Sequence, residues 1–288
     1  MDERVKITID GGVADVRLTR ADKMNALDNA MFEALISAGV RLKTEPGLRA
    51  VVLSGDGRAF CAGLDMGSFG DMASGGPRPA ARPGDERSPT GRTHGIANRA
   101  QYAVWVWREV PVPVIAAVHG VAFGGGFQLA LGADMRFVAP DARMAVMEIK
   151  WGLVPDMGGT QLMRHLARED VIRELTYTGR IFSGEEALAM GFATRVCADP
   201  HGEAMTVARE IAARSPHAIQ GAKRLLNDAV NTGPVEGFIQ ETREQVALIG
   251  RPNQIEAVMA NLQKRAPNFV DVAPGSGSQA TSAGTARP

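Results

Sequence analysis

The chain has 288 residues and no formal net charge, because 32 Lys and Arg residues balance 32 Asp and Glu residues. This balance offers no basic field for nucleic acid or a membrane surface. Two cysteines, Cys61 and Cys197, provide neither a disulfide framework nor a cysteine-rich metal site. The charged N-terminus differs from a secretory signal, and no apolar run reaches the roughly 18 residues of a membrane span. We therefore expect a cytoplasmic protein with no metal ion and no nucleic-acid or membrane partner.

The first 140 or so residues alternate predicted strands with predicted helices. Alternating residues over 6–9 and 13–18 flank Asp10-Gly11-Gly12 and predict a β-hairpin. An apolar stripe predicts a helix between Asp28 and Lys43, with Asp28 as its N-cap. Further predicted elements are a buried strand over 50–53, a helix over 96–108, a strand over 112–118, a helix over 124–131 and a strand over 134–138.

After about residue 200 the pattern predicts helices alone, over 216–230, 234–249 and 253–264. The first of these has Ser215 as its expected cap and Pro216 at its first helical position. We expect an α/β core over 1–198, a helical region over 199–270, and a disordered tail over 271–288. Residues 66–93 are rich in Gly, Pro, Arg and Ser and lack periodicity, so they form a functional or a disordered loop.

The segment 59–65, Ala-Phe-Cys-Ala-Gly-Leu-Asp, follows a predicted strand. Its small residues Ala62 and Gly63 allow another backbone or a ligand to approach closely. A tight turn without a ligand is the alternative interpretation.

Three consecutive glycines, 124–126, join a predicted strand to a predicted helix. They expose N–H groups at a helix N-terminus, where negative charge is favoured. A dinucleotide site would need a third spaced glycine where Leu129 stands, and a phosphate loop would need a lysine that is absent. A carbonyl oxyanion needs only one or two N–H donors, so it fits. Close packing of strand on helix is the alternative.

Two carboxylates, Glu148 and Asp156, lie in an otherwise largely apolar segment. An apolar pocket raises the pKa of a carboxylate, which suits general acid–base catalysis. A surface salt bridge is the alternative role for Glu148, and helix capping is the alternative for Asp156. The chain has no G-x-S-x-G motif, and its five histidines follow no metal-binding spacing.

Together these three segments, in this order and spacing, resemble the crotonase (enoyl-CoA hydratase/isomerase) superfamily. Residues 20–27, 183–191 and 264–265 extend the resemblance, which spans about residues 4–270. It implies an α/β fold, a spiral of β-β-α units with a C-terminal helical trimerisation region, and subunits that assemble as trimers or hexamers. It also implies that residues 66–93 form a flap over an acyl tunnel.

The resemblance further implies that the Leu64 and Gly125 N–H groups bind the thioester carbonyl of an acyl-CoA and stabilise its enolate. Coenzyme A is then part of the substrate, and no separate cofactor is expected. The residues expected to contact substrate or coenzyme A are Lys23, Ala26, Ala62, Leu64, Asp65, Gly124 and Lys264.

One departure from the family pattern affects the expected reaction. Family hydratases use two glutamates, and here one of those positions is Gln128 while the other is Glu148. An amide cannot exchange a proton as a carboxylate does. Asp156 stands where some dienoyl-CoA isomerases carry aspartate. We therefore favour isomerisation, with Glu148 as base and then acid, Asp156 as a second acid–base group or water positioner, and Gln128 orienting substrate or water.

Three alternatives remain open. The first is true hydration shared by Glu148 and Asp156. The second is a non-catalytic acyl-CoA-binding protein. The third is a hydrolase, although no serine lies between residues 89 and 182 to act as its nucleophile.

Overall fold

Six strands form the central sheet of the computed structural model, which describes residues 3–67 and 91–272. The first two strands pair antiparallel as the predicted hairpin, and the others pair in parallel. The strand order is β1-β2-β3-β4-β6-β8. The strands are β1 (Val5–Asp10), β2 (Val13–Leu18), β3 (Ala50–Gly55), β4 (Val114–Val118), β6 (Met135–Val138) and β8 (Arg195–Val196).

A second, two-stranded sheet pairs β5 (Val121–Phe123) with β7 (Arg143–Ala145) in parallel. No sequence pattern predicted it, because three-residue strands are too short to show periodicity. An isolated bridge between Cys61 and Ala122 joins the 59–65 segment to this sheet. The small sheet thereby brings two glycine-containing segments that are far apart in sequence to the same place.

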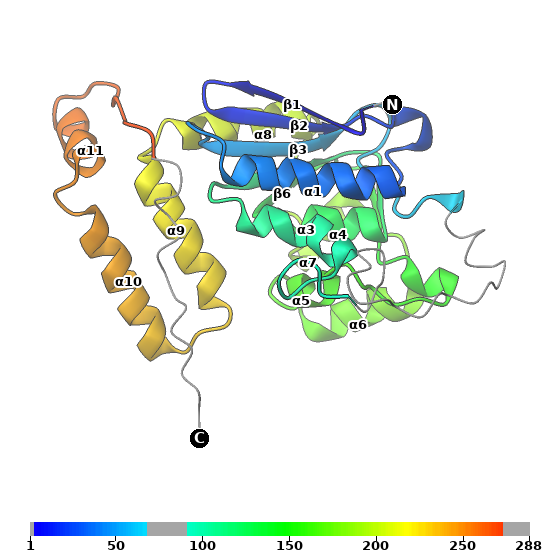
Figure 1. Ribbon diagram of the computed structural model, residues 1–288. Helices are drawn as coiled ribbons and strands as arrows, with labels where there is room; N and C mark the ends of the chain where they lie inside the picture. Colours follow the sequence, from blue (N-terminus) through cyan, green and yellow to red (C-terminus); the bar gives the residue numbers. More distant parts are fainter. Residues whose placement is uncertain (1–2, 68–90, 273–288) are drawn as a thin grey trace.

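Helices cover both faces of the central sheet (Figure 1). On one face lies the main core, which includes α1 (Asn29–Lys43), α3 (Arg99–Glu109) and α4 (Gly125–Leu131). On the other face lies α8 (Pro200–Ala212), whose Ala204 and Ala208 pack on Val52 and Ile115 in a separate cluster. Successive side chains of a strand point to opposite faces, which is why Val51 and Leu53 of β3 belong to the main core.

Two helix starts show how local capping sets the boundaries. The carboxylate of Asp28 accepts a hydrogen bond from the Met31 N–H at 2.8 Å, which confirms the predicted cap. The next helix, α3, begins three residues later than predicted, because Asn98 and Gln101 form a capping box there. The remaining short helices are η1 (Ala21–Lys23), η2 (Glu148–Trp151), α5 (Gly159–Met163), α6 (Glu169–Thr178) and α7 (Gly184–Met190).

The last three helices form an arm beside the core (Figure 1). They are α9 (Pro216–Ala229), α10 (Pro234–Leu248) and α11 (Pro252–Leu262), close to their predicted ranges. Ser215 is the N-cap residue of α9 and Pro216 its first helical residue, as predicted, although the Ser215 side chain makes no capping hydrogen bond. The predicted boundary at residue 198 places α8 with the arm, whereas α8 packs on the sheet. Residues 68–90 of the expected flap and 273–288 of the expected tail lie outside the described residues.

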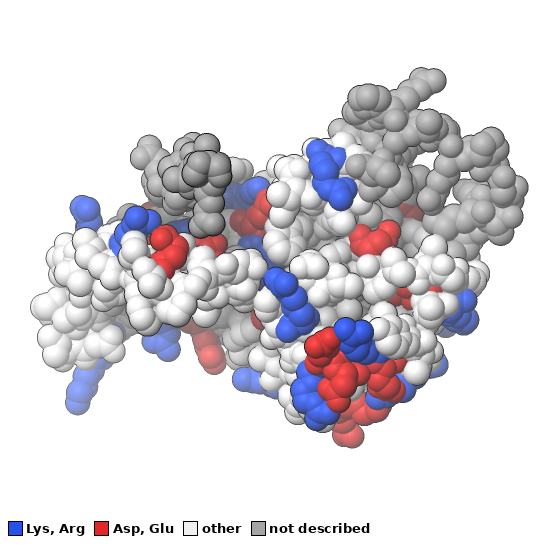
Figure 2. Space-filling view, turned by 90° about the horizontal axis from the view of Figure 1, so that it is seen from below, with Lys and Arg blue, Asp and Glu red and all other residues white. Residues whose placement is uncertain are grey.

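On the surface around α6, positively and negatively charged side chains lie next to one another (Figure 2). The Arg168–Asp170 and Arg173–Glu169 ion pairs are examples.

No residue of α10 is buried within the single chain. Its exposed apolar side chains are Val235, Phe238, Ile239 and Val246. None of the described helices is long and apolar enough to cross a lipid bilayer.

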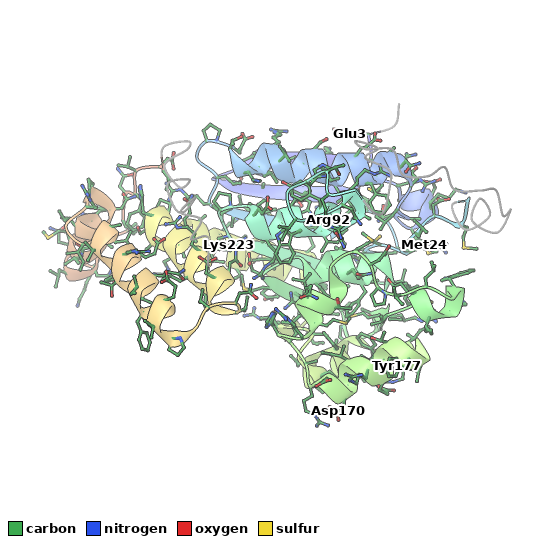
Figure 3. The ribbon with its side chains drawn as sticks, turned by 60° about the horizontal axis from the view of Figure 1, so that its bottom comes forward. Glu3, Met24, Arg92, Asp170, Tyr177 and Lys223 are labelled. Carbon is green, nitrogen blue, oxygen red and sulfur yellow. The ribbon has the colours of Figure 1, made fainter. Side chains whose placement is uncertain are left out.

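Lys223 anchors the arm to the core. Figure 3 shows it on α9, between that helix and the core. Its ammonium donates to the Val112 carbonyl and to the Asp134 carboxylate, both at 2.8 Å, and to the Trp107 carbonyl at 3.3 Å. Burial lowers the pKa of Lys223, and the charge of Asp134 opposes this shift. Lys223 and Asp134 line a cavity of about 460 Å³. None of the predicted site residues lines this cavity.

Replacing Lys223 with methionine should destabilise the fold. The substitution leaves two buried carbonyls without a donor, and breaking a buried pair costs about 3 kcal/mol. The midpoint of urea unfolding should fall accordingly, while Lys6→Met, on an exposed side chain, should leave it nearly unchanged. Equal midpoints for the two variants would show that Lys223 does not anchor the arm.

Candidate active site

A pocket of about 1330 Å³ brings together most of the residues that the sequence predicted. Its walls come from segments around η1, the start of α1, the 62–67 segment, the β5–α4 junction and the η2–α5 connection. Figure 3 labels Met24, one of its lining residues. The predicted site residues that line it are Lys23, Ala26, Ala62, Leu64, Asp65, Gly124, Gly125, Glu148 and Asp156.

The first expected oxyanion donor, the Leu64 N–H, lies opposite Leu27 in a parallel bridge. Leu27 donates to the Gly63 carbonyl at 2.8 Å and accepts from the Asp65 N–H at 3.1 Å. Both bonds use the neighbours of Leu64, so its own N–H points elsewhere. Gly63 has φ of +87°, which an L side chain rarely adopts, so glycine is required for this turn.

The second expected donor, the Gly125 N–H, belongs to the first turn of α4. The Gly124 N–H donates to the Ala145 carbonyl, and the Gln128 N–H closes the first helical turn onto the Gly124 carbonyl. First-turn N–H groups have no acceptor within their own helix. Within the described residues, neither the Gly125 nor the Leu64 N–H donates to a protein acceptor.

Backbone contacts hold the two donors side by side. The Cys61 N–H donates to the Val121 carbonyl at 3.0 Å, and the Phe123 N–H donates to the Cys61 carbonyl at 3.2 Å. A Cβ added to Gly63 would lie 3.6 Å from the Gly125 nitrogen, which shows how close the segments are. Two unused N–H groups at one place can stabilise a developing oxyanion.

Arg20 supports the same loop, and sequence reasoning missed it as an individual site residue. Its guanidinium donates to the Asp65 carboxylate at 2.6 Å and to the Ala26 carbonyl at 3.0 Å. The Gly67 N–H, and then the Arg20 guanidinium, hold the pKa of Asp65 below its usual value. Arg20 therefore ties the η1 segment to the Leu64 loop. An ion pair across 45 residues leaves no local signal in a sequence.

Glu148, at the start of η2, is the buried carboxylate of the pocket. Its side chain is only 9% exposed. Oε1 accepts a hydrogen bond from Gln128 Nε2 at 2.6 Å, whereas Oε2 is buried and has no partner among the described residues. Burial raises the pKa of Glu148, and the charge of Asp156 adds to this, while the backbone N–H groups of Glu148 and Met147 and the Gln128 amide oppose it. A carboxylate with a raised pKa is suited to take and return a proton.

Gln128 differs from its expected role. It is 1% exposed and is not among the pocket-lining residues. Its Oε1 accepts from the Met157 and Gly159 N–H groups, each at 2.9 Å, and its Nε2 donates to Glu148. These contacts are all with protein, so the expected contact with substrate or water finds no support in the geometry.

Asp156 is exposed and lines the pocket between η2 and α5. It does not cap the following helix, because Gly158 is the N-cap of α5 and offers no side chain. Asp156 is therefore not the N-cap residue of α5. Its charge acts on Glu148, so the pocket holds two carboxylates that influence one another.

Lys264 is the predicted contact that the single chain does not bring to the pocket. It is exposed and follows the end of α11 in the arm, rather than lying within that helix. Its contact with coenzyme A stays a prediction. Sequence analysis did not single out Phe32, Arg99, Trp151 or Val154, which line the pocket. Within the described residues, no group of three or more His, Cys, Asp or Glu side chains gathers to hold a metal ion.

The fold brings the residues that carry two unused backbone N–H groups and a buried carboxylate to the walls of one pocket. Residues 8–272 match the family described as enoyl-CoA hydratase/isomerase. The chain belongs to this family, and the crotonase-type α/β fold expected from the sequence is confirmed.

Individual relatives differ in their reactions. The chain is 31% identical to a rat mitochondrial Δ(3,5)-Δ(2,4)-dienoyl-CoA isomerase, over 88% of this chain and 77% of that protein. It is 33% identical to a carnitinyl-CoA dehydratase of Salmonella typhi, over 93% of this chain and 98% of that protein. The crystal structure of an enoyl-CoA hydratase from Bacillus anthracis superposes with a TM-score of 0.81 at 27% identity, covering 92% and 98% of the two chains.

Two substitutions of Gly125 should distinguish the effect of losing its N–H group from the effect of adding a side chain. Proline removes the N–H yet is tolerated in a first helical turn, so Gly125→Pro should lower kcat by roughly 10²–10³-fold. Gly125→Ala keeps the N–H and meets only the flexible side chains of Met157 and Leu27, so it should lose less activity. Turnover of an unsaturated acyl-CoA measures both. A folded proline variant as active as the alanine variant would exclude an oxyanion role.

Proposed function

We propose that the protein isomerises an unsaturated acyl-CoA by moving a proton between two carbons of the acyl chain. The observation that supports this most strongly is the state of Glu148. One of its oxygens is held by Gln128, and the other is buried and has no partner among the described residues. Glu148 lines the same pocket as Leu64 and Gly125, which carry the two unused N–H groups.

In the proposed reaction the thioester carbonyl accepts hydrogen bonds from the Leu64 and Gly125 N–H groups. The Glu148 carboxylate removes an α- or γ-proton, and the electron pair of that C–H bond moves toward the carbonyl oxygen. The two donors bind this growing charge more strongly than the neutral carbonyl, which lowers the barrier. The protonated Glu148 then returns its proton to another carbon, so the double bond has moved and nothing has been added.

Isomerisation is favoured over hydration because an amide, Gln128, stands where family hydratases carry a second glutamate. Hydration needs one group to deprotonate water and another to protonate carbon. Gln128 supplies neither, since an amide exchanges no proton at neutral pH and this one contacts only protein. Asp156 lines the pocket and is the remaining candidate for a second acid–base group. The similarity to the rat dienoyl-CoA isomerase agrees with this choice.

The pocket also suits a large thioester. Its volume of about 1330 Å³ exceeds the roughly 300–1,000 Å³ that is usual for small-molecule sites. The exposed Lys23 lies on its rim near Ala26, where we propose that coenzyme A binds. Coenzyme A is then part of the substrate rather than a separate cofactor.

Substitution of the two carboxylates tests this function. Glu148→Gln keeps the size of the side chain but removes the base, so kcat for a 3-enoyl-CoA should fall by several orders of magnitude with little change in affinity. Isomerisation by the wild type should be faster than hydration of crotonyl-CoA, because Gln128 supplies no second carboxyl group. Fast wild-type hydration that Asp156→Asn leaves intact would contradict the proposal, as would a Glu148→Gln variant within about tenfold of wild type.

The pH dependence should follow the raised pKa of Glu148. A base works only when ionised, so kcat/KM is fully present above this pKa and is lost as pH falls through it. The acidic limb should therefore lie above the ordinary glutamate range. Because the charge of Asp156 contributes to the shift, Asp156→Asn should move the limb to lower pH.

We also propose that the chain self-associates as trimers or hexamers. The exposed apolar side chains of α10, including Phe238 and Val235, would be covered by a neighbouring subunit. Light scattering of the purified protein should give a multiple of three subunits, and Phe238→Asp should reduce it. Ile96→Asp, which changes an exposed apolar side chain outside the arm, is the matched control. A monomeric wild type would exclude this assembly.

A further inference from the structure

The amide of Gln128 is held in one orientation. Two backbone donors, the Met157 and Gly159 N–H groups, converge on its Oε1 at 2.9 Å. A flipped amide would direct its NH₂ group at these two donors and lose both hydrogen bonds. Nε2 must therefore point the other way, where it meets Glu148 Oε1 at 2.6 Å. The side chain is 1% exposed, so water cannot easily replace these partners.

This orientation distinguishes the two oxygens of Glu148. An amide NH₂ donates and cannot accept, and the carbonyl oxygen of a protonated carboxyl group accepts hydrogen bonds better than its hydroxyl oxygen. Oε1 consequently stays an acceptor whether the carboxyl group is ionised or protonated. Oε2 has no partner among the described residues, so it is the oxygen left to take a proton.

Because Gly159 has no side chain, the Gln128 amide can pack directly against it. A Cβ built on Gly159 would lie 2.7 Å from Gln128 Oε1 and 2.9 Å from Gln128 Cδ, which is closer than real Cβ atoms approach other groups. The amide therefore occupies the space that any side chain at position 159 would need. A substitution at this glycine offers a second, independent way to displace the same amide.

We propose that Gln128 is a positioning residue that holds Glu148 in one orientation and confines its proton exchange to Oε2. The same amide ties Glu148 to the 157–159 turn, which directly follows Asp156, so it also fixes the second carboxylate relative to the first. This inference rests on the proposed function, in which Glu148 moves the proton. It assigns Gln128 no contact with substrate.

Few charged groups bear on this arrangement. Asp156, on the connection that faces η2, is the charged group that acts on Glu148. Lys150, on the same element as Glu148, lies over the ring of Trp151 instead, at 5.6 Å from its centroid. Gln128 itself is neutral, so replacing it removes its three hydrogen bonds without changing the charge of the site.

Gln128→Met tests the proposal, because methionine has a similar length and neither donates nor accepts strongly. With a 3-enoyl-CoA substrate, kcat should fall by roughly 10–100-fold from the misplaced base, while KM stays near wild type. The amide N–H stabilises the ionised carboxylate, so its loss should move the acidic limb of the kcat/KM profile to higher pH. Gly159→Ala should shift the limb in the same direction.

Matched controls are available on the same chain. Gln161→Met changes an exposed glutamine of α5, and Gly233→Ala changes the glycine before α10, whose added Cβ meets nothing within 4 Å. Both controls should keep the wild-type profile. Circular dichroism checks that each variant is folded. If Gln128→Met does not fold, Gly159→Ala tests the proposal alone.

The outcomes separate this proposal from the function on which it rests. An unmoved acidic limb in folded Gln128→Met and Gly159→Ala, with Glu148→Gln inactive, would overturn the positioning role and leave the function intact. A raised KM at unchanged kcat would instead show that Gln128 contacts substrate. Reduced thermal stability with unaltered pH profile would show a structural role alone. An active Glu148→Gln variant would remove the function itself.

Discussion

The site depends on one close contact between two stretches of backbone, residues 61–63 and 121–126. Their carbonyl and N–H groups bond directly to one another, as in the Phe123–Cys61 pair. Side chains would prevent this, because a Cβ on Gly126 would collide with the Cys61 carbonyl and one on Gly63 would lie 2.5 Å from the Phe123 carbonyl. Glycine at both positions is thus a condition for placing the Leu64 and Gly125 N–H groups together, and the pocket is built around that pair.

One short helix then links the donors to the base. Gly125 starts α4 and supplies an N–H from its first turn, and Gln128 lies three residues later on the same face. The position of the proposed oxyanion donor and the proposed orientation of Glu148 therefore depend on the same seven-residue element. A displacement of α4 would disturb both together, which explains why all its residues are buried and why its packing on β5 matters to the chemistry.

The sequence predicted those parts of the site that depend on neighbouring residues. The two glycine segments, the hairpin and the Asp28 cap are local patterns, and each is found where expected. What the sequence could not predict depends on pairs far apart along the chain. The Gln128–Glu148 bond joins residues 20 apart, and the Arg20–Asp65 pair joins residues 45 apart. The location of α8 on the sheet was missed for the same reason, since an amphipathic helix does not indicate which surface covers it.

Glu148 Oε2 has no hydrogen-bond partner among the described residues, and a partner there would lower the pKa of this carboxyl group. Leaving a buried polar atom without a hydrogen bond costs about 1–3 kcal/mol, which a folded protein ordinarily avoids. A second donor on Oε2 would remove that cost, but it would also stabilise the ionised carboxylate and lower its pKa, weakening the base. Among the described residues, Gln128 is the side-chain donor to Glu148, on Oε1, and burial keeps the pKa of Glu148 raised against it. The same oxygen that destabilises the free protein is then the one that accepts the substrate proton in the proposed reaction.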